Sequence, residues 1–335
     1  MLTNKIKEKA VQLGYSGCGI IPAEIFEEYN KSLDERAKSF PESKEFYESQ
    51  AGRAVPPANS KSIIVCVRGY NHYKIPPKLE KHIGKYYLFH GGIPYSQAFA
   101  AKAEFEAFLQ VSGIGILKSQ PPPVRWAAAK AGLGKFGRNN FIFTNQHGSH
   151  THIDTWVVDT ALEYGNPAAD YLMPGCKAGC RKCIQACPTK ALNGDFSMDR
   201  SKCITHLMYE KKPLPSELRA QMGQWLYGCD VCQDVCPMNK GKLTNTEDFP
   251  LLSQYEEHIE PEKILLMDDD TYTNIVYPRF WFAGKDATLT WQCNALRCMI
   301  NSGDARYRKL IQECSNHPEP RIRGIARWGC ENTVE

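Results

Sequence analysis

The sequences CKAGCRKCIQACP (residues 176–188) and YGCDVCQDVCPM (residues 227–238) decide what kind of fold this chain has. The first has the spacing C-x3-C-x2-C-x3-C-P and the second has C-x2-C-x3-C-P, with Cys203 between them. Bacterial two-cluster ferredoxins have C-x2-C-x2-C-x3-C-P, and the fourth cysteine of such a run binds the other cluster. We therefore predict two [4Fe-4S] clusters, each completed by a cysteine from the other segment.

Two such clusters need eight thiolate ligands, and the two segments with Cys203 contain eight cysteines. Short spacings let consecutive thiolates reach one cube, while the x3 step turns the next side chain toward the neighbouring cube, and the following proline stops the helix. The first step is x3 where ferredoxins have x2, and we expect a bulge at residues 177–179 to absorb the extra residue. We assign the first cluster to Cys176, Cys180, Cys183 and Cys236, and the second to Cys187, Cys203, Cys229 and Cys232.

Zinc is the alternative metal, because it also takes four thiolates. Zinc ribbons usually have paired C-x2-C knuckles separated by a longer loop and lack the Cys-Pro endings, so the spacing favours iron–sulfur clusters. The other six cysteines are expected to be core residues. They are Cys18, Cys66, Cys293, Cys298, Cys314 and Cys330.

The composition is that of a globular protein with two or three domains: 335 residues, 42% hydrophobic, 23% charged, net charge +4. Such a mild charge permits an anionic partner without demanding one. The N-terminal MLTNKIKEKAVQLGY has helical spacing and lacks the apolar core of a signal peptide. No run of about 18 apolar residues occurs. We therefore expect a cytoplasmic protein with no membrane contact, and a reducing compartment in which fourteen cysteines serve as metal ligands and core residues rather than disulfides.

We predict an α+β fold in three parts. Residues 1–165 read as an α/β cofactor-binding domain, residues 166–245 as a two-cluster ferredoxin-like domain, and residues 246–335 as a small helical, HEAT-like domain. Expected helices lie at 4–13, 23–39, 95–109, 294–301, 306–315 and 319–331, and expected strands at 62–67 and 153–158.

The loop AGLGKFGRNN contains Gly132, Gly134 and Gly137, which match G-x-G-x-x-G. A dinucleotide-binding loop follows a strand and opens a helix. Here a helix-like RWAAAKA precedes the glycines and a strand-like NNFIF follows them, so the order is reversed and argues against that reading.

Several motifs in order resemble the epoxyqueuosine reductase family, which is related to the reductive dehalogenases. They are AGLGKFGRNN, CPTKAL, SKCITHLMYE and YGCDVCQDVCPMN, with IKEKAVQLGYSGCGI and NALRCMINSGD extending the resemblance over nearly the whole chain. The resemblance implies an oxidoreductase with a base-off cobalamin between the first two domains, electrons passing through both clusters to cobalt, and epoxyqueuosine in tRNA as substrate. The residues that match the family's cofactor-binding loop are Arg125, Gly132, Gly134, Gly137, Arg138 (in place of lysine) and Asn139.

The chain departs from the family at its proton donor. The family's Asp-Ser-Ala-Pro is replaced here by Lys118-Ser-Gln-Pro, and its upstream Asp-Tyr-His is missing, the nearest stretch being HGGIPYS. Burial can lower a lysine's pKa enough for proton delivery. Lys118 with Tyr95 is therefore our catalytic candidate, against the plainer reading of a surface lysine at a loop edge.

A second departure concerns RNA. The stretch AGKDATLTWQCNALRC carries far less positive charge than the family's helix in this place, which weakens the case for tRNA as a partner, since phosphate contacts supply most non-specific affinity. The basic residues that remain are Arg306, Arg308, Lys309, Arg321 and Arg323. Both departures allow for a family member with a different, small-molecule substrate.

Three histidines fall within QHGSHTH: His147, His150 and His152. Strand alternation places His150 and His152 on one face beside the cofactor region, and we expect them to be polar lining rather than metal ligands.

The sequence thus predicts a reductase that takes electrons from ferredoxin or flavodoxin. Two alternatives stay open. One is an electron-transfer protein that reduces a partner's corrinoid or flavin without substrate chemistry of its own. The other is an RNA-binding protein whose clusters are structural.

Overall fold

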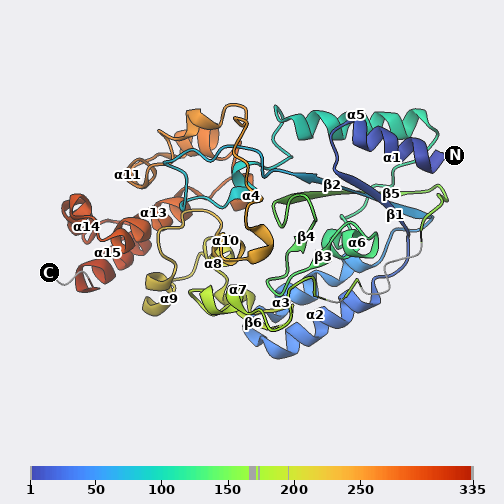
Figure 1. Cartoon of the computed structure of the whole chain (residues 1–335). Helices are drawn as coiled ribbons and strands as arrows, with labels where there is room; N and C mark the ends of the chain where they lie inside the picture. Colours follow the sequence, from blue (N-terminus) through green and yellow to red (C-terminus); the bar gives the residue numbers. More distant parts are fainter. Residues whose placement is uncertain (1, 166–170, 173, 195, 333–335) are drawn as a thin grey trace.

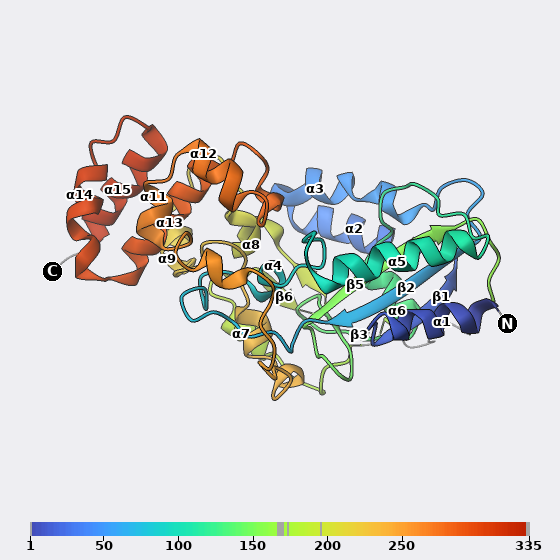
Figure 2. The ribbon, with the colours of Figure 1, turned by 90° about the horizontal axis from the view of Figure 1, so that it is seen from above.

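The computed structural model describes residues 2–165, 171–172, 174–194 and 196–332 (Figure 1). The expected boundary between residues 165 and 166 adjoins residues 166–170, which lie outside the described residues. In two perpendicular views the N-terminus and the C-terminal helices lie at opposite ends of the molecule, and the cysteine-containing segment lies between them (Figures 1 and 2).

A three-stranded sheet organises the N-terminal part. Its strands are β1 (Gly17–Pro22), β2 (Ser62–Gly69) and β5 (Thr151–Val158), in the order β1-β2-β5. Both pairings are antiparallel, whereas an α/β domain normally has parallel strands. The expected strands at 62–67 and 153–158 are confirmed, because runs of β-branched residues suit the buried centre of a sheet.

Helices cover both faces of this sheet (Figures 1 and 2). Alternate residues of β2 serve opposite faces: Ile64 packs with the helices of one layer, and Ile63 and Val65 pack with those of the other. The first layer contains α1 (Leu2–Gln12) and α5 (Gln97–Val111); the second contains α2 (Glu27–Ser39), α3 (Lys44–Ser49) and α6 (Val124–Lys130).

Helix α5 shows how local sequence sets these elements. The Ser96 hydroxyl accepts a hydrogen bond from the Phe99 N–H at 3.1 Å, which caps the first turn. The helix ends before Gly113, whose φ of +78° is the left-handed conformation common after a helix. Phe105 and Leu109, one turn apart, point into the core and are fully buried.

The cysteine-containing segment has only short elements. Its hairpins are β3–β4 (Lys135–Phe136, Ile142–Phe143) just before it and β6–β7 (Leu192–Gly194, Ser197–Met198) within it. Its helices are α7 (Lys182–Ala186), α8 (Ile204–Leu207), α9 (Ser216–Gln221) and α10 (Val231–Asp234). Because such pieces bury little apolar surface, the segment depends on its neighbours for stability, and the predicted clusters would add to it.

The C-terminal part is helical around one central helix, α13 (Thr288–Ser302), of which eleven residues are buried. Helix α13 packs against helices on both sides, as expected for stacked helical hairpins. The expected helices at 294–301, 306–315 and 319–331 are confirmed, although the first begins at Thr288. The neighbouring helices are α11 (Pro261–Leu265), α12 (Asp269–Thr271), α14 (Arg308–Cys314) and α15 (Pro320–Asn332).

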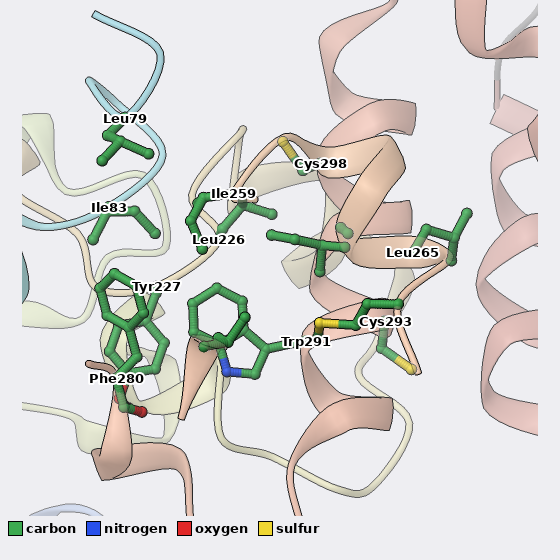
Figure 3. Close-up of a cluster of buried hydrophobic side chains, with 14 of the residues drawn as sticks. Leu79, Ile83, Leu226, Tyr227, Ile259, Leu265, Phe280, Trp291, Cys293 and Cys298 are labelled. Carbon is green, nitrogen blue, oxygen red and sulfur yellow. The ribbon is translucent and has the colours of Figure 1, made fainter. Parts of the chain in front are cut away.

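The largest hydrophobic core crosses the expected domain limits. Leu79 and Ile83 from the N-terminal part join Leu226 and Tyr227 of the cysteine-containing segment and Trp291 of α13 (Figure 3). The segment of residues 70–93, which includes α4 (Lys85–Leu88), therefore belongs to the core of the C-terminal helices.

A buried arginine strengthens this junction. The Arg297 guanidinium of α13 donates hydrogen bonds to the carbonyl oxygens of Gly223, at 2.8 Å, and Trp225, at 2.5 Å. Its pKa is lowered to about 10 by burial.

Within the described part of the chain, no helix is both long and apolar enough to cross a membrane.

Replacing Phe105 by alanine tests the two-layer packing of the sheet. Phe105 is fully buried between Tyr15 and Trp156, with ring centroids 6.0 and 4.7 Å away. We expect F105A to lower the free energy of unfolding by about 3–5 kcal/mol, measured by urea denaturation followed by circular dichroism. The control V111A, at a position of the same helix that is 90% exposed, should change it by less than about 0.5 kcal/mol. Equal effects of the two substitutions would contradict this packing.

Candidate functional site

The cysteines expected to bind the first cluster lie together. Burial is the largest cause that raises the pKa of the Cys183 thiol, and the nearby Cys176 and Cys236 raise it further. The pKa of the Cys236 thiol is raised in the same way, first by burial and then by the nearby Cys176 and Cys180. The Arg138 N–H donates a hydrogen bond to the Cys176 sulfur at 3.4 Å. Cys236 is thus electrostatically coupled to the segment that begins at residue 176.

The cysteines expected to bind the second cluster form another group. Burial raises the pKa of Cys229 first, and Cys203 and Cys187 add to the shift. The pKa of the Cys232 thiol is also raised, first by burial and then by Cys229 and Cys203. The Ala191 N–H donates to the Cys187 sulfur at 3.3 Å, the kind of contact that lowers the energy of a thiolate. Cys187 therefore couples to cysteines that follow it in sequence.

The two groups touch through Cys183, which also raises the pKa of Cys232. Two neighbouring sets of four thiols are the donor chemistry that iron–sulfur clusters use. The division of ligands between the clusters stays a prediction, which these electrostatic couplings support.

The extra residue in the first spacing is accommodated by a turn. The Cys180 N–H donates to the Lys177 carbonyl at 3.1 Å, and Gly179 has a φ of +71°. This left-handed conformation favours glycine, which explains its presence between the two cysteines.

The largest of the five described cavities, referred to below as the largest cavity, has a volume of about 580 Å³ and lies against the second cysteine group. All four cysteines of that group line it, together with Arg125 and a run of residues that starts at Asn139. The Asn139 amide donates to the Cys232 carbonyl at 3.2 Å, which ties the loop to the cysteine segment. Its size lies in the usual range for small-molecule and cofactor sites.

Arg125 faces the interior of this cavity. Much of its side chain remains accessible there, yet protein atoms surround the guanidinium and burial, followed by the charge of Arg36, lowers its pKa to about 10. It donates a hydrogen bond to the Asn140 carbonyl. A cation at this place suits an anionic or polar group of a cofactor.

The residues expected to bind the cofactor divide into separate places. Arg125 and Asn139 line the largest cavity, whereas Gly132 and Gly134 line another cavity of about 470 Å³. A side chain at Gly134 would lie 2.5 Å from Ile142 and 2.9 Å from the Phe143 carbonyl. This glycine is therefore required by the β3–β4 hairpin whether or not a cofactor is near.

The two expected catalytic residues are not brought together. Tyr95 precedes α5 and its hydroxyl accepts a hydrogen bond from Arg279 at 3.3 Å. Lys118 follows the far end of α5, is exposed, and does not line any of the five described cavities. The fifteen-residue helix between them is about 22 Å long, and the chain after it pairs Ile116 with Val158 at the end of β5.

His150 and His152 both contact the ring of Tyr70, at centroid distances of 5.7 and 4.7 Å. Burial lowers the pKa of each to about 4, so both are neutral at pH 7. His152 lines a polar cavity of about 410 Å³, and His147 lies apart, with its Nδ1 2.7 Å from the Asn71 Oδ1.

Within the described residues, no three His, Cys, Asp or Glu side chains are arranged to hold a single metal ion.

Sequence reasoning missed Tyr86, Tyr87 and His90. Tyr86 lines both the 410 Å³ cavity and a cavity of about 260 Å³, which shares Tyr87, Arg125 and Cys229 with the largest one. The signal was present as two polar aromatic residues and a histidine at helical spacing in GKYYLFH, but such spacing is more often a sign of core packing.

The segment of Tyr86 is fixed to the second cysteine group by a buried ion pair. The Lys85 ammonium lies 3.3 Å from Asp230 and 2.6 Å from Asp234, and the Lys85 N–H donates to Asp230 at 2.7 Å. Asp230 directly follows Cys229. Breaking a buried pair costs about 3–5 kcal/mol, so the geometry is strongly held.

Comparisons with known proteins agree with this arrangement. Residues 176–239 match the 4Fe-4S double cluster binding domain. The epoxyqueuosine reductase of Cellulophaga algicola is 30% identical over 75% of this chain and 83% of its own length. A solved structure of epoxyqueuosine reductase from Bacillus subtilis, with an aspartate catalytic loop swung out of the active site, is 26% identical with a TM-score of 0.78, covering 100% of this chain and 91% of that one. An epoxyqueuosine reductase solved with a modified tRNA-Tyr stem loop has a TM-score of 0.79 at 23% identity, covering 100% of this chain and 90% of that one.

Pairs of cysteine substitutions test the crossed ligand sets. Anaerobically reconstituted protein should hold about eight iron atoms, and C176S and C236S should each hold about four. Because both residues belong to one predicted cluster, the double variant C176S/C236S should also hold about four, whereas C229S/C236S should hold almost none.

The control for this series is C330S, at an exposed position on α15, which should keep about eight iron atoms. Iron lost in equal amounts from both double variants, or bound zinc in place of iron, would contradict the assignment.

Proposed function

This chain belongs to the epoxyqueuosine reductase family and is an iron–sulfur oxidoreductase, and we propose that its clusters deliver electrons to a base-off cobalamin in the largest cavity for reduction of epoxyqueuosine in tRNA. The observation that carries this proposal is the position of that cavity. Its wall contains the four cysteines of the second group, so a cofactor held there lies next to the second cluster.

The lining also offers hydrogen-bonding groups that nothing in the described chain satisfies. The Nδ2 of Asn140, the Nε of Arg200 and the Nδ1 of His206 are buried without a hydrogen-bond partner among the described residues. Buried polar atoms normally have partners, and a small rotation of these three side chains would turn the atoms toward a polar occupant of the cavity. A cobalamin ring with amide side chains fits this need, and Arg125 and Asn139 would hold it beside the cysteines.

When bound, cobalamin would supply a low-potential one-electron centre. The residues of this chain would position it, keep water from the reduced site, and deliver protons to the substrate. The first cysteine group is absent from the described lining of the largest cavity, so electrons would enter through the first cluster and leave through the second. A one-electron donor such as ferredoxin or flavodoxin fits this order, and we propose a cytoplasmic location for the pair.

One observation favours a second candidate for the substrate. The relative solved with a tRNA stem loop supports a tRNA substrate for this family. Here the stretch AGKDATLTWQCNALRC is poor in positive charge, and this favours a smaller epoxide or related molecule reduced through the same clusters.

Cobalamin binding tests the proposal directly. After anaerobic reconstitution with iron, sulfide and cobalamin, we expect one cobalamin per chain, seen in the absorption spectrum alongside about eight irons. R125M should weaken the binding at least about tenfold, because it removes a cation from the cavity wall. The control R327M, at an exposed position on α15, should bind as the native chain does.

Clusters that form without any cobalamin binding would favour the electron-transfer alternative. Salt-sensitive binding of a tRNA stem loop without turnover would favour the RNA-binding alternative.

The loop lysine has its own test. If Lys118 delivers the proton, K118A should lower turnover of an epoxyqueuosine-containing stem loop by about 10²-fold or more. Because Lys118 is exposed and lies at the far end of α5 from Tyr95, we expect a change of less than about threefold in the steady-state rate. A loss above tenfold would assign proton delivery to this loop.

A further inference from the structure

Tyr86 and His90 form a hydrogen-bonded pair one helical turn apart. Tyr86 lies in α4, and His90 lies two residues beyond the end of that helix. The His90 Nε2 is 3.1 Å from the Tyr86 hydroxyl, and the Gly92 N–H donates to the His90 Nδ1 at 2.9 Å.

The second of these bonds fixes the direction of the first. Because Nδ1 accepts the Gly92 N–H, it carries no proton, and a neutral imidazole then has its proton on Nε2. Nε2–H therefore donates to the Tyr86 oxygen. The tyrosine's own hydrogen is left to point elsewhere, and within the described residues no side chain or carbonyl accepts it.

Tyr86 lines two cavities. One is the polar cavity of about 410 Å³, which His90 also lines. The other is the 260 Å³ cavity, whose lining includes Arg125 and Cys229 and which continues toward the second cysteine group. A substrate in the polar cavity and a cofactor against the cysteines would meet at Tyr86.

Neighbouring elements keep this pair in its neutral form. Burial, and then His152, lowers the pKa of His90 to about 3, with Asp154 opposing and Lys102 adding to the shift. Burial, and then Asp154, raises the pKa of Tyr86 to about 12, with Arg125 opposing. Tyr86 thus holds its proton at pH 7, while His90 can only donate through Nε2.

Aromatic contacts from the C-terminal part fix the imidazole ring. Trp281 and Phe282 lie 4.9 and 5.0 Å from it, each with its ring plane at about a right angle. The C-terminal helices therefore help to orient a group that lies beside the N-terminal sheet.

We propose that Tyr86 is the proton donor to the oxygen that leaves the substrate, and that His90 is the positioning residue that aims its hydrogen. This rests on the proposed function. Conversion of an epoxide to an alkene takes two electrons and two protons, breaks both carbon–oxygen bonds and releases water. The electrons come one at a time from the external donor through the clusters. One proton moves from Tyr86 to the departing oxygen, and the second comes from solvent, which also returns the tyrosinate to its neutral form.

This chain lacks the aspartate that serves as proton donor in the family, so another residue must supply the proton. Lys118 occupies the place of the family's acid but is exposed, whereas Tyr86 has an available hydrogen beside the cavity wall. General acid catalysis typically contributes about 10²–10⁴-fold to a rate.

The test uses native protein loaded with both clusters and cobalamin, and an epoxyqueuosine-containing tRNA anticodon stem loop as probe. We expect Y86F to lower the single-turnover rate of epoxide reduction by about 10²–10⁴-fold. Its iron content, its affinity for cobalamin and the rate at which cobalt is reduced should match the native values, because the ring stays in place. The matched control is Y73F, which removes a hydroxyl from a buried tyrosine of the neighbouring aromatic core and should keep the native rate.

The role of His90 is tested by a pair of substitutions. H90L removes the donor to Tyr86 and should slow reduction at least about tenfold, whereas H90Q keeps an N–H within reach and should recover most of the rate. The native enzyme should show a solvent deuterium isotope effect on this step, and Y86F, which receives its proton from water, should show a different one. Failure of H90Q to recover the rate would reduce His90 to a packing residue and overturn its positioning role.

The outcomes separate this inference from the function beneath it. Loaded native protein that leaves the epoxide intact would overturn both. Native protein that reduces the epoxide while Y86F does so equally fast would overturn the role of Tyr86 alone.

Discussion

Each of two chain segments places one cysteine among the cysteines of the other, and the architecture of the site follows from this exchange. Cys187 couples to Cys203 and Cys229, and Cys236 couples to Cys176 and Cys183. If each cluster takes a ligand from both segments, as the spacing predicts, binding of the clusters and folding of residues 176–239 depend on each other. The second group then has a fixed position, and it forms a wall of the largest cavity.

The N-terminal part is held to this wall by residues 70–93. The pair of Lys85 with Asp230 joins the segment to the residue after Cys229, and Leu79 and Ile83 anchor it in the core around Trp291 (Figure 3). A buried ion pair contributes little net stability compared with apolar packing, but it specifies one register. Here that register places Tyr86 between the polar cavity and the cysteines. Positioning of this kind is what a reaction needs when its proton and its electrons arrive from different directions.

Much of this was predictable from the sequence because the signals are local. Cysteine spacing predicted two sets of cysteines, and the electrostatic couplings in the structure support that division. Runs of β-branched residues predicted the strands at 62–67 and 153–158. Antiparallel pairing was not predicted, since strand direction depends on how distant segments dock. The glycine loop was read as one cofactor site, but Gly134 and Asn139 line different cavities, and spacing does not tell which side of a hairpin a residue faces. The pairing of Tyr95 with Lys118 ignored the length of the helix between them. Tyr86 was missed because the role proposed for it depends on a tautomer of His90 fixed by the Gly92 N–H, which only coordinates reveal.

The crossing of the largest core over the expected domain limits also restricts how such chains diversify. Because residues 70–93 and α13 share one core, a C-terminal part taken from a relative would bring apolar side chains shaped for a different partner. Recombination near residue 246 would join two half-cores that never adapted to each other. Exchange of substrate range by module shuffling is therefore disfavoured, and new specificities would arise by point substitutions along the cavities.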